Sequence, residues 1–426
     1  MPLVARVLID SPLPQLDRLF DYAVPAALES AVAPGVRIKV PLRTAGRVVE
    51  GYLVELVDAA GIPAPAKPLS ELAAVVSPVP VLTPALYALA RRVADRAAGS
   101  ASDILRLVIP RRMVRAEKAW LAAQQQAERP DAAAPALAGS PTDAPAAPSD
   151  DSCAVLASFP GLSDFPGLSD AVAAGARVAV DAPPRPSHAL PVGAWAELIA
   201  AIALDTLARD RSALIVVPDQ RDQEQVLAVL TLHAPGGVIV RDDARRSGPE
   251  RYADYLRLVA GPPAIVVGNR STVYAPARDV GVVIVWDDGD PLLSEPLSPG
   301  VHVRDAALVR QELEGSALVF AGHTRTTDVE RLVQLGWVRE LPARRRESPA
   351  IVLSATREGE SRGQRVTSAA FAAAREALHT GPVLVQVARP GYAPVLVCAS
   401  CRAPARCPHC AGPLRARRRG AAPDCG

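Results

Sequence analysis

Short apolar runs separated by turn residues open the chain. They lie at residues 4–10, 36–42 and 50–57, and Pro34 and Gly35 form a turn signal before the second run. Runs of this length that are rich in β-branched residues and bounded by turn residues are typical of strands. Residues 1–80 are therefore predicted to form a small β-rich domain, either a barrel or a sandwich.

The spacing of apolar residues becomes helical at residues 82–112. Thr83 and Pro84 form the N-cap and the first position of one helix, and a second short helix follows in "SASDILRLVIPRR". Two short helices with a basic end suit a winged helix or a helical bundle. We therefore expect residues 81–112 to form a winged-helix-like segment.

Residues 113–194 break both patterns. The segment is rich in Ala, Pro, Asp and Ser and holds few large apolar residues, which is typical of linkers. The direct repeat "FPGLSDFPGLSD" at 159–170 is too short for a repeat fold and indicates a local duplication in a loop. We expect this segment to act as a linker.

Strands and helical periods alternate in residues 195–390. The predicted strands are apolar runs at residues 213–219, 237–242, 264–269, 280–287, 317–322 and 382–388. Buried strands joined by crossover helices predict a doubly wound parallel sheet. Ligands of such sheets bind beyond the carboxyl ends of the strands, where "PDQRD", "GNRS", "WDDGD" and "GHTR" lie. The whole chain is thus expected to be a multidomain α/β protein.

Composition narrows the function only slightly. The 426 residues are 49% hydrophobic and carry a formal net charge of +2, so any anion-binding surface must be local. The first residues lack the features of a signal peptide, and no apolar run approaches the ~20 residues that a membrane helix needs. We expect a cytoplasmic protein without a membrane partner.

The strand at 280–287 ends in carboxylates, as nucleotide-binding strands do. A phosphate-binding loop also needs a Lys after a Gly, but no Lys of this chain follows a Gly. The segment "SHALPVGA", which precedes the helix predicted from residue 195, holds one Gly and no Lys. The sheet is therefore predicted to be helicase-like with a degenerate P-loop, and we expect no ordinary ATP hydrolysis there.

Three residues at this edge are candidates for a degenerate nucleotide site. Asp287 and Asp288 could bind magnesium weakly or be solvated carboxylates, and we favour the second alternative. Arg270 could contact a DNA phosphate or pair with one of these aspartates. Trp286, which precedes them, is expected to be packed in the core.

Five of the six Cys gather in the last 29 residues. The stretch "CASCRAPARCPHC" has the pattern C-x2-C-x5-C-x2-C, and two such pairs suit tetrahedral zinc. In a reducing compartment this clustering favours metal over disulfides. Residues 391–426 are thus predicted to form an apparently truncated zinc module with the ligands Cys398, Cys401, Cys407, Cys410 and Cys425. Five thiolates cannot fill two four-ligand sites, so at least one site is incomplete.

Several stretches resemble the family of primosomal protein N′, the replication restart protein PriA. "FDYAVP" at residues 20–25 follows a strand, "GVRIKVPL" resembles the next strand of that family, and "IVVGNRSTVYAP" resembles its "VVGTRSA" stretch. The paired Cys motifs come last, in the order that the family has. The resemblance extends over most of the chain outside about residues 113–195. The chain resembles the actinobacterial branch of this family, whose members lack detectable helicase motifs.

The resemblance implies an N-terminal domain that captures the 3′ end of a leading strand, in residues 1–80, and a winged helix that grips parental duplex. It places these residues in DNA binding: Phe20, Asp21, Tyr22, Arg37 and Lys39. Tyr22 would lie beneath the pocket, and Ala73 stands where many members carry a Lys. The resemblance also implies two interleaved zinc sites. Cys407, Cys410 and Cys425 would belong to one site, and Cys398 and Cys401 to the other.

Family helicases carry a GKT loop, a DEEH box and a GSAT motif, where this chain has "LPVGA", "WDDG" and "GHTR". We therefore predict a restart factor that binds abandoned forks and promotes primosome assembly and reloading of the replicative helicase, without helicase activity. It would be a nucleoid-associated monomer that meets primosome proteins, the helicase loader, the replicative helicase and single-strand-binding protein. Two alternatives stay open: an active ATP-dependent 3′→5′ helicase and a truncated product without function.

Overall fold

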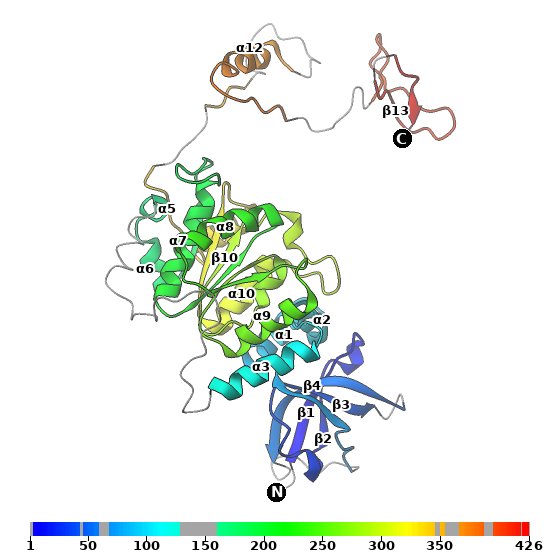
Figure 1. Ribbon diagram of the computed structural model, residues 1–426. Coiled ribbons are helices and arrows are strands. Elements are labelled where there is room, and N and C mark those ends of the chain that lie inside the picture. The colour runs from blue at the N-terminus through cyan, green and yellow to red at the C-terminus, as the bar shows by residue number, and fades with distance from the viewer. Residues whose placement is uncertain are drawn as a thin grey trace. The chain divides into compact units, whose positions relative to one another are not determined.

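The computed structural model describes residues 3–42, 46–58, 68–127, 160–345, 350–353, 366–386, 395–418 and 420–425. The chain divides into two compact units, Met1–Glu347 and Ser348–Gly426. The first unit contains an N-terminal barrel, three helices that follow it and a parallel sheet (Figure 1). No helix of the described residues is long and apolar enough to cross a membrane.

The N-terminal sheet is antiparallel and has the order β2-β1-β4-β3-β5. Its strands are β1 (Leu3–Ile9), β2 (Leu19–Ala23), β3 (Val36–Leu42), β4 (Arg47–Asp58) and β5 (Ala74–Pro80), with short 3-10 turns η1 (Pro14–Leu16) and η2 (Ala26–Leu28). The segment before β5 closes the sheet, because the Ala23 amide donates to Ser70, the Leu72 amide donates to Ala23, and the Ala73 amide donates to Lys39. The predicted β domain is confirmed, and it is a small barrel.

Three helices follow the barrel: α1 (Pro84–Arg96), α2 (Ala101–Val108) and α3 (Val114–Ala127). The Thr83 hydroxyl accepts a hydrogen bond from the Leu86 amide, so the predicted N-cap of α1 is confirmed, and Ser100 caps α2 by accepting one from the Asp103 amide. The third helix falls inside the range 113–194, which the sequence predicts to be a linker.

The larger sheet has seven parallel strands in the order β12-β6-β11-β10-β7-β9-β8. They are β6 (Arg177–Asp181), β7 (Ser212–Val216), β8 (Ile239–Asp242), β9 (Ile265–Gly268), β10 (Val280–Trp286), β11 (Ala317–Gly322) and β12 (Arg339–Glu340). Every residue of β7, β9, β10 and β11 is buried, as expected of strands covered on both faces. The doubly wound parallel sheet is therefore confirmed.

Helices cover both faces of this sheet (Figure 1). One apolar core joins α6, α7 and α8 to one face, and a second core joins α9 and α10 to the other, together with α1 and α2. The helices of the sheet domain are α5 (Pro160–Ser163), α6 (Leu168–Ala173), α7 (Ala194–Ala208), α8 (Gln220–His233), α9 (Gly248–Ala260), α10 (Val303–Glu314) and α11 (Thr327–Gln334), with 3-10 turns η5 (Arg270–Tyr274) and η6 (Pro291–Leu293).

Two parts of the expected organisation need correction. The sheet begins at β6, inside the predicted linker, because "RVAVD" is a short run whose flanking Ala, Gly and Pro residues hide it. At the other end, residues 382–386 of the strand predicted at 382–388 are not a strand, and Leu384 is 92% exposed. The second unit contains α12 (Ser368–Ala377), β13 (Leu414–Arg415) and β14 (Asp424–Cys425). Cys153 and much of the linker, at 128–159, lie outside the described residues.

The barrel and the sheet domain share one core. Leu8 and Val81 from the barrel side belong to the same buried cluster as Tyr255 and Val283 of the sheet domain. Polar contacts reinforce it, since the Tyr255 hydroxyl donates to the Val81 carbonyl at 2.6 Å. The barrel is therefore fixed to the sheet domain by packing as well as by the chain.

Glu117 of α3 is the ionic centre of this joint. Its side chain is 2% exposed and accepts hydrogen bonds from Arg112, at 2.6 Å, and from the Tyr252 hydroxyl of α9, also at 2.6 Å. Burial alone would raise the pKa of Glu117, but the hydrogen bonds from Arg112, Tyr252 and Ser77 outweigh it and lower the pKa. Ser77 belongs to β5, so one carboxylate connects the barrel, α3 and α9.

We expect Glu117→Gln to destabilise the protein by about 1–3 kcal/mol, because a neutral amide replaces the buried carboxylate that accepts hydrogen bonds from the partly exposed Arg112 and from Tyr252. The measurement is urea unfolding. Because the folded pKa lies below the ordinary value, the stabilisation is present above that value and is lost as the pH falls through the folded pKa. The difference between wild type and variant should therefore shrink below about pH 4.

Glu312→Gln is the matched control, because its carboxylate pairs with Arg96 at 3.4 Å on an exposed surface. Exposed pairs contribute about 0–1 kcal/mol. Equal losses in the two variants, at every pH, would contradict the central role of Glu117.

Candidate functional site

Strand β2 carries the first three residues that the sequence predicts to bind DNA. Phe20 pairs with Val7, whose side chain is in the barrel core, so Phe20 points inward. Its ring lies at the edge of that core, under the Arg18 guanidinium at 4.5 Å from the ring centroid. Tyr22 also points inward, is 5% exposed and donates its hydroxyl to the Pro41 carbonyl at 3.2 Å. Asp21 lies on the outer face.

The outer position of Asp21 separates it from Phe20. Its carboxylate is 3.7 Å from the Arg6 guanidinium, which also pairs with Glu55 at 3.1 Å. Successive residues of a strand face opposite sides, so the described geometry does not bring Phe20 and Asp21 to one surface. A one-sided pocket would use only one of them.

Strand β3 carries Arg37 and Lys39. The Arg37 guanidinium donates to the Pro110 carbonyl at 2.6 Å and lies 5.9 Å from the centre of the Tyr52 ring. Burial raises the pKa of the Tyr52 hydroxyl to about 12, although the Arg37 charge opposes that rise. The structure thus places Arg37 in the joint between the barrel and the helices. Lys39 is exposed, and its carbonyl accepts the Ala73 amide at 2.9 Å, so it neighbours the position at which many family members carry a Lys.

The segment β6, residues 182–193 and α7 has the order strand, loop and helix that cradles phosphate in P-loop proteins. Here Trp195 of α7 stacks on Trp286 of β10, with ring centroids 4.2 Å apart and 10° between the planes. His323 meets the edge of Trp286 at 5.1 Å. Both indoles are buried, as expected for Trp286. A Cβ atom on Gly193 would lie 2.4 Å from the Trp195 ring, so the glycine of this loop accommodates an indole.

Most backbone amides of the loop are already used. Four of its twelve residues are Pro, which has no N–H. Six amides donate within the protein: those of residues 182, 185, 187, 189, 190 and 193. The acceptors include the Ser187 hydroxyl and the Gln225 amide oxygen. Among the described residues, this leaves only His188 and Val192 with amides that could bind a phosphate.

The carboxylates after β10 are engaged as well. Asp288 accepts hydrogen bonds from Arg304 and from the Thr326 hydroxyl, each at 2.8 Å. Asp287 has a φ of 48°, in the left-handed region, and burial, Asp290 and Asp288 raise the pKa of its carboxyl group. Asp288 is thus a structural ion-pair partner.

Arg270 pairs with neither of the two aspartates considered for it. Its Nε donates to Glu295 at 2.6 Å. Of the two alternatives for Arg270, pairing with Asp287 or Asp288 is not found, because Glu295, in a segment beyond η6 whose return to β9 no local pattern reveals, takes that place. Arg325 was missed in the same way, and it pairs with three carboxylates of the described chain, those of Asp181, Glu330 and Glu340. The Arg side chains of these loops are thus engaged in ion pairs within the protein.

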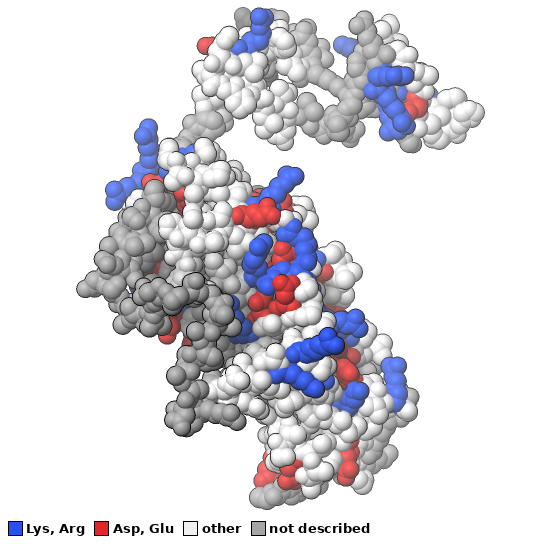
Figure 2. Space-filling view, in the orientation of Figure 1, with Lys and Arg blue, Asp and Glu red and all other residues white. Residues whose placement is uncertain are grey.

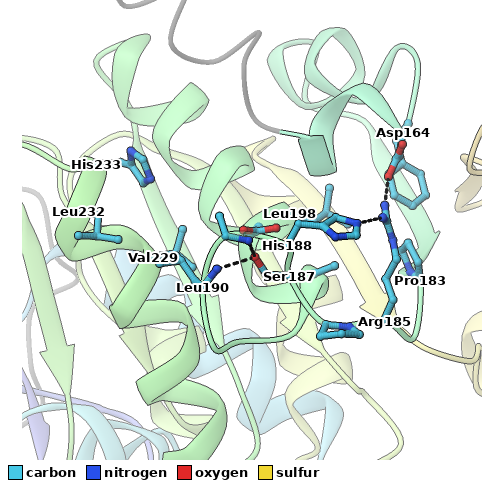
Figure 3. Close-up of a pocket in the computed structure, with 15 residues that line it drawn as sticks. Asp164, Pro183, Arg185, Ser187, His188, Leu190, Leu198, Val229, Leu232 and His233 are labelled. Carbon is cyan, nitrogen blue, oxygen red and sulfur yellow. Dashed lines mark hydrogen bonds and ion pairs between the residues drawn. The ribbon is translucent and has the colours of Figure 1, made fainter. Parts of the chain in front are cut away.

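Beside the loop lies a hollow of about 450 Å³ (Figure 3). Apolar side chains, among them Leu190, Leu198 and Leu232, line much of it. On its rim Arg185 donates to Asp164 at 2.8 Å and lies 3.2 Å from the His188 ring nitrogen. No local sequence pattern predicts this hollow, because its walls come from the residues after α5, the loop, α7 and α8.

In the second unit, Cys407, Cys410 and Cys425 form a group whose sulfur atoms all lie within 4.8 Å of one another. Pairing of β13 with β14 brings Cys425 into the group. Backbone N–H groups of His409 and Cys410 and a hydrogen bond with Cys425 lower the pKa of the Cys407 thiol to about 7. Three thiols gathered in this way fit zinc, which takes four ligands in structural sites. Cys398 and Cys401 are not part of this group.

Comparison with known proteins identifies the barrel. The 3′ DNA-binding domain (3′BD) of PriA matches residues 6–110. "Probable replication restart protein PriA" of Mycobacterium tuberculosis is 36% identical over 416 residues, covering 94% of this chain and 58% of that protein. The chain is of the PriA type.

Other relatives agree with this assignment. The Mycobacterium leprae protein of the same name is 35% identical over 94% of this chain and 59% of its own length. "Replication restart protein PriA" of Bacillus subtilis is 23% identical over 48% of this chain and 26% of its own length. The chain therefore spans less than two thirds of these relatives.

The matched domain is larger than the sequence pattern predicts. It ends at residue 110 and so includes α1 and α2, which the sequence analysis places in a separate winged-helix-like segment at 81–112. The physical reason is that both helices pack into the core that contains Leu8 and Val81, and a helical period cannot indicate which core its apolar face joins.

We expect Cys407→Ser to lower the zinc content of the purified protein, because it removes one of three gathered thiolates. Native mass spectrometry or elemental analysis measures the loss. Ser400→Ala is the control, since Ser400 is an exposed residue of the same unit and not a Cys, and it should leave the zinc content unchanged. Equal zinc content in the Cys407 variant and the wild type would disprove the assignment.

Proposed function

We propose that this protein recognises abandoned replication forks through the 3′ end of the leading strand and promotes primosome assembly without acting as a motor. The observation that carries the proposal is the 3′ DNA-binding domain of PriA at residues 6–110, fixed to a sheet whose nucleotide place is filled by two indoles. The whole-length activity is part of the proposal, because the chain spans 58% of its mycobacterial relatives.

The inner face of β2 supports recognition of a DNA end. Phe20 lies at the edge of the barrel core with Arg18 over its ring, and an aromatic ring beside a cation suits the stacking of one terminal base. The low overall charge of +2 favours such a local contact over a broad basic groove.

The loop between β6 and α7 supports a role without ATP hydrolysis. A triphosphate needs a cationic side chain and free amides around its β- and γ-phosphates. This loop offers no Lys, and most of its amides donate within the protein. Asp288, at the place of a magnesium ligand, pairs with Arg304.

The assembly role follows from the family. The curated relatives are named as replication restart proteins, and restart requires a helicase loader and replicative helicase to be brought to the fork. We propose that the chain is a monomer that marks the fork and binds these proteins and single-strand-binding protein there. It would do so in the cytoplasm, near the nucleoid. Zinc held by the Cys407 group would stabilise the second unit.

Phe20→Ala should weaken binding to a fork with a free leading 3′-hydroxyl about tenfold, which corresponds to about 1–2 kcal/mol of lost base stacking. Affinity for the same fork with a blocked 3′ end should change little. Fluorescence anisotropy with the two forks measures the ratio.

Asp21→Ala is tested separately, because Asp21 lies on the opposite face of β2 from Phe20. Val48→Ala, which alters an exposed side chain of β4, is the control for the barrel surface. If both forks lose affinity equally in the Phe20 variant, recognition of the 3′ end by this face is refuted.

DNA-stimulated ATP hydrolysis by the full chain should stay at background, because nothing in the loop positions the γ-phosphate. A coupled phosphate-release assay with fork DNA is the measurement. Turnover above background that disappears in Asp287→Asn with Asp288→Asn would establish the alternative, an active helicase of the restart primosome.

A further inference from the structure

Outside the matched domain, α3 and the start of α9 carry a group of basic side chains without internal partners. Arg115 and Lys118 of α3 are three residues apart, which places them on one side of the helix, and Arg111 lies in the segment just before α3. All three are exposed. Figure 2 shows Lys and Arg side chains over this part of the molecule, between the sheet domain and the barrel.

Two further Arg residues lie next to this row. Arg241 of β8 and Arg251 of α9 line a small hollow together with Pro110, and Pro110 directly precedes Arg111. The start of α9 is held against α3, since a Cβ atom on Gly248 would lie 2.7 Å from the end of the Met113 side chain. We call the group of Arg111, Arg115, Lys118, Arg241 and Arg251 the α3–α9 basic face.

The carboxylates around the α3–α9 basic face are all engaged elsewhere. Glu117 is buried with Arg112 and Tyr252, and Asp242 accepts hydrogen bonds from Ser271 and Thr272. The remaining acids and their partners are Asp243 with Arg245, Asp254 with Arg246, and Glu250 with Ser247. In the described part of the chain, none of the five cations of the face forms a side-chain hydrogen bond or ion pair.

We propose that the α3–α9 basic face binds the phosphate backbone of duplex DNA, as a second contact beyond the 3′-end domain. Four of these five cations are exposed, and none of the five forms an ion pair within the described residues; in a chain of net charge +2, such a group indicates an external anion. Among the described residues this face exposes no Trp, Tyr or Phe on which a base could stack. Backbone contact without stacking is the mode suited to a duplex.

The joint between barrel and sheet domain gives this face a fixed place relative to the barrel. Pro110, next to Arg111, accepts a hydrogen bond from Arg37 of β3, and Glu117 lies between Arg115 and Lys118 in the sequence while its carboxylate binds Tyr252. A duplex arm on the α3–α9 basic face would therefore keep one distance from a strand end at β2. The inference rests on the proposed fork binding and adds the place where the arm lies.

The test is the salt dependence of fork binding by the full chain with Arg111→Gln, Arg115→Gln and Lys118→Gln combined. Each phosphate contact adds about 0.9 to the slope of log affinity against log salt concentration, so the variant should lose about 2 to 3 from that slope. Its preference for a free 3′-hydroxyl should remain. A companion variant with Arg111→Lys and Arg115→Lys keeps all three positive charges, because Lys118 is unchanged. It should retain the wild-type slope.

The matched control replaces three exposed Arg residues elsewhere, with Arg221→Gln, Arg331→Gln and Arg339→Gln, which removes the same charge and should leave the slope unchanged. If the α3 variant keeps the wild-type slope, the face does not bind DNA phosphate and the inference is wrong; a surface for an acidic protein would give this result. If the slope falls equally in the control, the effect is general charge, and the inference fails too. If the wild type itself binds forks with a free and a blocked 3′-hydroxyl equally, the proposed function is refuted instead.

Discussion

The stack of Trp195 on Trp286 is the contact on which the proposed role depends. The two rings occupy the place between the loop after β6 and the end of β10, where a P-loop protein holds phosphate and magnesium. Removing a buried Trp costs about 3–5 kcal/mol, so a nucleotide that displaced both rings would have to supply more than that. Because the surrounding amides and Asp288 already have partners, little on this loop is left to repay the cost.

The sheet domain is fixed to the barrel by packing. The core that contains Leu8, Val81 and Tyr255 passes from the barrel into the sheet domain without a break, and Glu117 adds buried polar contacts to it. Rotation of one part against the other would expose this apolar surface. The first unit therefore holds the barrel and the α3–α9 basic face at a fixed separation. A fixed separation suits the proposed recognition of a DNA structure.

The sequence predicts those features whose cause is local. Continuous apolar runs predicted the strands β7 to β11, and Thr83 with Pro84 predicted a helix start. Cys spacing predicted the pair Cys407 and Cys410, and the resemblance to the family added Cys425 to it. Features made by distant segments were out of reach. Trp286 was expected in the core, but its partner lies about ninety residues earlier. Arg270 pairs with Glu295 and not with Asp287 or Asp288. Strand β6 was not predicted, because it lies in a segment of linker-like composition.

The same distinction explains why the candidate DNA-binding residues could be named only by resemblance. Alternation along β2 sends Phe20 to the barrel core and Asp21 to the outer face, and Arg37 turns to Pro110 at the joint. A motif names such residues together because they are adjacent in sequence, whereas the barrel separates them. The cations of α3 have no motif, yet geometry leaves them exposed beside acids that are already paired. In this chain, whether a charged side chain has a partner within the protein indicates its role better than the residues next to it in the sequence.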